Sequence, residues 1–213
     1  MKIASPLLTV LALTACSALA IKAQVPSPSN ELPKDTHQGF TVSADPYTDA
    51  DRAKKEFGKA DPYKAGILAV QVFFKNDLNA PVHVDLSTIR LDVKNPNGEH
   101  ANIRALTAPQ AAARIAHPKG ISSPKPRHFP VPLPGGNLPG KDSKTQDMED
   151  KLTPFSLQSD VVPPNGTLHG VIFFDISGQF DVVSHSSLYV PDVKSVASQS
   201  SMIYFEVPLG PQR

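Results

Sequence analysis

Hydrophobic and polar residues alternate most clearly between residues 65 and 93, in a run rich in β-branched and aromatic residues. The first half of this run places one set of apolar side chains on a single face of an extended chain, namely Leu68, Val70, Val72 and Phe74. The second half alternates Val82, Val84 and Leu86 with polar residues. Asn-Asp-Leu-Asn at 76–79 separates the halves, and such clusters are typical of a loop between strands. The segment therefore predicts a hairpin in a central antiparallel sheet that is buried mainly on one face.

Further short strands are predicted along the chain, with turn residues about every ten positions. They fall at 40–44, 89–93, 101–106, 155–157, 161–162, 169–176, 187–190 and 202–207. Two short helices are also expected, at 49–57 with Thr48 as N-cap and at 107–116 with Thr107 as N-cap. The pattern predicts a mainly β protein, an antiparallel β-sandwich with two short helices.

Residues 1–23 have the pattern of an export signal: Lys2, an apolar stretch and then small residues. Leu13-Thr14-Ala15-Cys16 resembles the bacterial lipobox, in which the cysteine is acylated and becomes the first residue of the mature chain. Ala18-Leu19-Ala20 offers an alternative site for ordinary cleavage and release. Cys16 is therefore a predicted lipidation site. We expect an exported protein of the bacterial envelope, lipid-anchored in the periplasm or at the outer membrane, or otherwise secreted.

The remaining chain divides into a tether, a domain and an insertion. Residues 24–38 are rich in Pro, Ser, Asn and Lys and are expected to form a flexible tether. Residues 39–213 are expected to form one β-sandwich domain with a Pro-rich insertion at about 117–152. Within it, residues 118–140 hold seven prolines and four glycines. This composition predicts either a disordered loop or an arm in polyproline conformation that a partner binds.

Two motifs carry a family resemblance. The segment 70–76 is a hydrophobic strand that ends in Asn76, and 163–175 has a Pro/Gly turn, Gly170 and an apolar strand that ends in Asp175. Together they resemble bacterial immunoglobulin-like lipoprotein domains of the telokin-like type, over about half of the chain. The two helices and the long insertion depart from that pattern. The resemblance implies an immunoglobulin-like fold and an envelope location, and it supplies no catalytic residues.

Composition excludes several kinds of function. The 21 Lys and Arg residues nearly balance the 20 Asp and Glu residues, for a net charge of +1, which gives no support for nucleic-acid binding. The single cysteine, Cys16, lies in the leader. The folded part therefore has no thiol for a disulfide, a metal site or a nucleophile.

One cluster of carboxylates suggests a metal. Asp45, Asp49 and Asp51 surround Tyr47, and closely spaced oxygen ligands are those that Ca²⁺ prefers. Their spacing does not match an EF-hand loop, and acidic residues are also common in turns and at helix N-termini. A calcium site is thus one hypothesis and simple turn chemistry the other. No other metal or cofactor is expected.

The sequence offers no catalytic motif. None of the seven histidines stands in a metal-binding His-Glu-x-x-His pattern, and no Gly-x-Ser-x-Gly motif accompanies Ser184-His185-Ser186. We assign no catalytic residue and expect a non-catalytic binding or scaffold module.

Its partner would be an envelope protein or a cell-surface ligand. Candidate contact residues are Tyr47, Tyr63, Arg127 and Phe129. Two alternatives remain open: an exported enzyme whose site combines scattered Asp, Glu and His residues, and an envelope or secretion assembly subunit that uses strand pairing.

Overall fold

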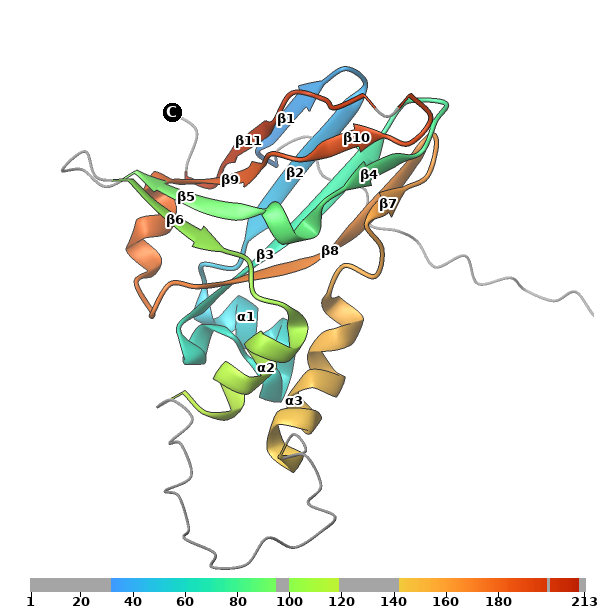
Figure 1. Cartoon of the computed structure of the whole chain (residues 1–213). Helices are drawn as coiled ribbons and strands as arrows, with labels where there is room; N and C mark the ends of the chain where they lie inside the picture. Colours follow the sequence, from blue (N-terminus) through green and yellow to red (C-terminus); the bar gives the residue numbers. More distant parts are fainter. Residues whose placement is uncertain (1–31, 95–99, 119–141, 199, 211–213) are drawn as a thin grey trace, which may run out of the picture.

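The computed structural model describes residues 32–94, 100–118, 142–198 and 200–210 (Figure 1). In these residues the protein is mainly β, with three antiparallel sheets and short helices. The first sheet has the order β1 (Lys34–His37), β2 (Phe40–Pro46), β3 (Ile67–Asn76), β8 (Gly166–Asp175). The second has the order β10 (Val193–Ser195), β4 (Val82–Val84), β7 (Val161–Val162). The third has the order β11 (Phe205–Pro208), β9 (Ser186–Val190), β5 (Arg90–Lys94), β6 (His100–Arg104).

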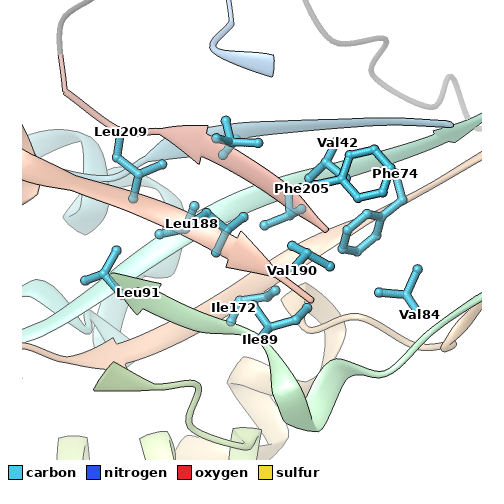
Figure 2. Close-up of a cluster of buried hydrophobic side chains, with 14 of the residues drawn as sticks. Val42, Phe74, Val84, Ile89, Leu91, Ile172, Leu188, Val190, Phe205 and Leu209 are labelled. Carbon is cyan, nitrogen blue, oxygen red and sulfur yellow. The ribbon is translucent and has the colours of Figure 1, made fainter. Parts of the chain in front are cut away.

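The three sheets share one hydrophobic core. The predicted apolar face of β3, from Leu68 to Phe74, is fully buried in it. Figure 2 shows Val42 and Phe74 of the first sheet close to Phe205 and Val190 of the third. Alternation with a period of two therefore placed the core residues of β3 correctly, because successive side chains of a strand point to opposite faces.

A second core lies on the other face of the first sheet. Three helices cover the lower end of β3 and β8 in Figure 1: α1 (Ala50–Phe57), α2 (Ala108–Ala116) and α3 (Ser143–Leu152). Their apolar residues, such as Phe57 and Leu152, pack against Ala69 and Phe173 of the sheet. The expectation that the central sheet is buried mainly on one face is therefore wrong at this end, where both faces are covered.

The predicted central hairpin does not form. Strand β3 pairs with β2 and β8, whereas β4 pairs with β10 and β7, so the two halves of the run belong to different sheets. Asn76 redirects the chain between them: its side-chain amide donates to Ala80 O at 2.8 Å, and its Oδ1 accepts from Leu78 N at 3.0 Å. These local bonds close a loop that carries the chain out of the first sheet.

Strand β5 follows as a separate strand and pairs with β6 and β9. The strand predicted at 89–93 is therefore confirmed as a separate strand, and the one predicted at 101–106 is confirmed as its antiparallel neighbour over 100–104.

The predicted tether and insertion both contain regular structure. Residues 34–37, expected to be flexible, form β1 and pair with β2 in the register Lys34↔Ser43. The end of the predicted insertion forms a third helix, α3, so the expectation of two helices is also wrong. Sequence reasoning missed α3 because prolines and charges dominated the composition of that region. Residues 119–141 lie outside the described residues, and so do 1–31 with the predicted signal, Cys16 and most of the tether.

The helix ends follow cap chemistry. Helix α1 is capped by Asp49, whose Oδ1 accepts from Arg52 N at 2.7 Å, and not by Thr48 as predicted. Helix α2 confirms Thr107 as N-cap, in a reciprocal capping box with Gln110. Among the described helices, none combines the length and the apolar character that a membrane span requires.

Candidate functional site

The most chemically varied cavity lies on the outer face of the first sheet, where the helical layer ends. It measures about 360 Å³, and we call it the Tyr47 pocket. Its lining combines three carboxylate or amide side chains, four rings and two further residues: Asp45, Glu56, Gln71, Tyr47, Phe73, Phe155, His169, Pro154 and Gly170.

Strand pairing builds the floor of this pocket. The register places Asp45 opposite Gln71 and Phe73 opposite His169, so residues from three strands share one face. The rings of Phe73 and His169 stack with centroids 5.9 Å apart. Gly170 allows the neighbouring loop to come close, because a Cβ at this position would lie 2.7 Å from Leu157 N. The wall formed by Pro154 and Phe155 depends on this loop.

An ion pair holds one rim of the pocket. The Arg52 guanidinium donates to both Asp45 oxygens, at 2.9 Å to Oδ1 and 2.5 Å to Oδ2. The same guanidinium lies over the Tyr47 ring, 4.3 Å from its centroid. The hydrogen bonds to Asp45 raise the pKa of Arg52. Arg52 therefore neutralises Asp45 and fixes the ring of Tyr47 at once.

Tyr47 remains a neutral phenol. Burial raises its pKa above the usual value, and the nearby charge of Glu56 raises it further. A group with a raised pKa keeps its proton at neutral pH, so the hydroxyl of Tyr47 can donate as well as accept, and Arg52 is one of its hydrogen-bond partners. The carboxylate of Glu56 has no ion-pair partner among the described residues, and it makes the pocket slightly acidic.

The three aspartates proposed as a calcium site are not gathered into one group in the structure. Asp45 binds Arg52, Asp49 caps α1, and Asp51 lies in the exposed first turn of that helix. Within the described ranges, no group of three His, Cys, Asp or Glu residues is placed to hold a metal ion. Asp49 thus has the helix-capping role that the alternative interpretation gives to such residues, whereas Asp45 forms an ion pair.

The candidate contact residues separate in the structure. Tyr47 lines the pocket, but Tyr63 lies elsewhere and stacks on Phe180 with centroids 3.8 Å apart. Arg127 and Phe129 lie outside the described residues. Sequence reasoning missed Glu56, Gln71 and His169 as site residues. The alternation in β3 could have placed Gln71 beside Phe73, but the position of His169 depends on a strand pairing across about a hundred residues.

The pocket is suited to binding polar groups. Carboxylate and amide oxygens accept hydrogen bonds, and the aromatic rings offer flat apolar surfaces. In the described part of the chain, no hydrogen bond joins His169 to a carboxylate or a hydroxyl group, and its ring instead stacks on that of Phe73.

The edges of the first sheet are covered. Leu106 N donates to Phe173 O at 2.8 Å, and Ser156 forms a bridge with Val171, so two loops protect β8. At the other edge, Asp35 of β1 accepts from Glu206 N of β11 at 2.9 Å. These two edges do not offer the flat, uncovered strand that the strand-pairing alternative requires.

Comparisons with known proteins add little. No protein-family model matches the chain, and no curated protein matches it. A solved structure of a functionally unknown protein from Listeria monocytogenes EGD-e aligns over 84% of this chain and 82% of its own chain, with 10% identity and a TM-score of 0.37. A likeness this low carries no information on function.

Proposed function

We propose that this protein is an exported, lipid-anchored binding module of the bacterial envelope, with an immunoglobulin-like β-sandwich fold and no catalytic activity. The lipobox-like Leu13–Cys16 supports the anchor, and the antiparallel sheets that share one core support the fold. The ligand binds in the Tyr47 pocket.

The observation that carries this proposal is that hydrogen-bond acceptors and aromatic rings line the same cavity. Gln71 and Glu56 supply hydrogen-bond acceptors, and Phe155 and His169 supply ring surfaces beside them. Sugars combine hydroxyl donors with apolar C–H faces, so they fit this lining. Because Arg52 neutralises Asp45 while Glu56 keeps its charge, an amine-bearing sugar fits better than an acidic one. The cavity, at about 360 Å³, lies at the small end of typical ligand sites.

Binding of glucosamine tests the proposal. We expect saturable binding in a titration followed by NMR or calorimetry, and about tenfold weaker binding for Glu56→Gln, since the ammonium loses its charged partner. Asp51→Asn is the matched control, because it removes the same charge from α1 without touching the pocket. An uncharged N-acetylglucosamine disaccharide shows how much binding depends on the amine. If neither sugar binds, or if both variants weaken binding equally, the Tyr47 pocket is not the ligand site.

A further inference from the structure

A second cavity, of about 540 Å³, lies at the C-terminal end of α1. Three lysines line it: Lys54 from α1, Lys59 from the 3-10 turn η1 (Gly58–Ala60) and Lys64 from the 3-10 turn η2 (Tyr63–Ala65). Ile115 near the end of α2 and Pro118, which follows that helix, also line it. We call this cavity the lysine pocket, and it shares no lining residue with the Tyr47 pocket.

The backbone brings the three lysines together. Gly58 ends α1 with a φ of +58°, which favours glycine, and its N–H returns to Lys54 O. Asp61 then holds the start of η2, since its Oδ1 accepts from Tyr63 N at 3.0 Å. Two tight turns in succession therefore place cations that are five residues apart on one rim.

Positive charge in this pocket is not balanced. Asp61 is its one carboxylate among the described lining residues. The side chain of Asp61 is only 4% exposed, and its Oδ2 lies 3.8 Å from Lys64 Nζ. Lys54 and Lys59 form no ion pair with the residues that the structure describes, so the pocket keeps an excess of two positive charges. A concave surface lined by one sign of charge concentrates its field and attracts a counter-ion.

The adjoining chain does not supply that counter-ion. Residues 119–141, which follow Pro118 in the sequence, contain Lys119, Lys125, Arg127 and Lys141 but no Asp or Glu. A balancing anion must therefore come from outside this segment.

We propose that the lysine pocket binds a ligand that carries a phosphate monoester. Such a group carries about −1.5 to −2 charges at pH 7, which matches the excess positive charge of the pocket. Lysine ammonium groups bind phosphate as point charges and do not require the planar geometry of arginine. The phosphate belongs either to a soluble compound, such as a sugar phosphate, or to a lipid headgroup at the membrane surface. This proposal does not depend on the Tyr47 pocket.

A titration with glucose 6-phosphate tests the soluble source. The variant Lys54→Gln/Lys59→Gln removes two cations from the pocket, and the matched control Lys34→Gln/Lys55→Gln removes two exposed cations outside it. We expect saturable binding to the unmodified protein, at least about tenfold weaker binding to the pocket variant, and less than about a twofold change in the control. All four lysines are exposed, so thermal unfolding of both variants should match that of the unmodified protein.

Vesicles test the lipid source. Vesicles that contain phosphatidic acid, whose headgroup is a phosphate monoester, are compared with vesicles of phosphatidylcholine alone. An N-terminal anchor contributes equally to the unmodified protein and the variant, so it cancels in the comparison. If the pocket variant binds phosphatidic acid vesicles more weakly than the unmodified protein does, while the two bind phosphatidylcholine vesicles equally, the ligand is a lipid headgroup. If glucose 6-phosphate binds saturably and the two proteins bind phosphatidic acid vesicles equally, the ligand is a soluble compound. Equal losses in the pocket variant and the control, or no binding of either probe, would overturn the proposal.

Discussion

At the scale of single residues, the structure shows what Asn76, the asparagine at the end of β3, does. Its side chain is fully buried at the end of β3. Its Nδ2 donates to Ala80 O at 2.8 Å and to Pro163 O at 3.1 Å, so it joins the loop after β3 to the turn before β8. The Asn at the end of a hydrophobic strand, which carried the family resemblance, is therefore a link between two distant loops.

Replacing Asn76 with Ala should destabilise the protein by about 1–3 kcal/mol, because the fully buried amide and its hydrogen bonds to Ala80 O and Pro163 O are lost. Chemical denaturation checks this value. Asn79→Ala is the control: Asn79 is exposed and its side chain accepts a hydrogen bond from the exposed Asn165 side chain, so we expect a change below about 0.5 kcal/mol. A similar small loss for both variants would mean that the Asn76 bonds contribute little.

At the scale of elements, the local sequence predicted where helices begin and end better than it predicted which strands pair with one another. Thr107 and Gln110 form the capping box of α2 because that motif needs only four neighbouring residues. The helices themselves are amphipathic and short, and they depend on the sheet: Phe57 of α1 is 4% exposed and meets the rings of Tyr47, Phe155 and Phe173. Short helices gain most of their stability from such packing.

Phe57→Ala should cost about 3–5 kcal/mol and loosen the helical layer before the sheets. Hydrogen exchange measures this: amides of α1 should lose protection more than amides of β5 and β9. Leu188→Ala, which removes a fully buried side chain from the other core, should cost about 2–5 kcal/mol and affect β5 and β9 first. If both variants gave the same exchange pattern, the two cores would form a single cooperative unit.

At the scale of the whole molecule, two hydrophobic cores stabilise the domain. The proposed lipid anchor precedes the domain in the sequence. Stability must come from burial, because Cys16 is the only cysteine in the sequence and no intrachain disulfide can form. A lipid on Cys16 would hold the domain at a membrane surface, within reach of envelope ligands.

The intact mass of the mature protein from membrane and soluble fractions tests this anchor. We expect a diacylglycerol-sized addition on Cys16 in the membrane fraction, and we expect Cys16→Ala to abolish both the addition and the membrane association. An unmodified chain that begins near Ile21 would instead show cleavage after Ala20 and a freely secreted protein.

The sequence by itself determined the mainly β character, the apolar face of β3 and the cap of α2, and it shows that the described residues contain no cysteine. These features depend on composition or on residues a few positions apart, where geometry is fixed by the period of a strand or a helix. Only the tertiary structure decided that β3 and β4 enter different sheets, that Asp45 binds Arg52, and that His169 meets Phe73. The partners of β3 and β4 include strands from the far end of the chain, and Phe73 and His169 lie about a hundred residues apart. Such choices depend on which surfaces bury the most apolar area together, and no local pattern records that competition.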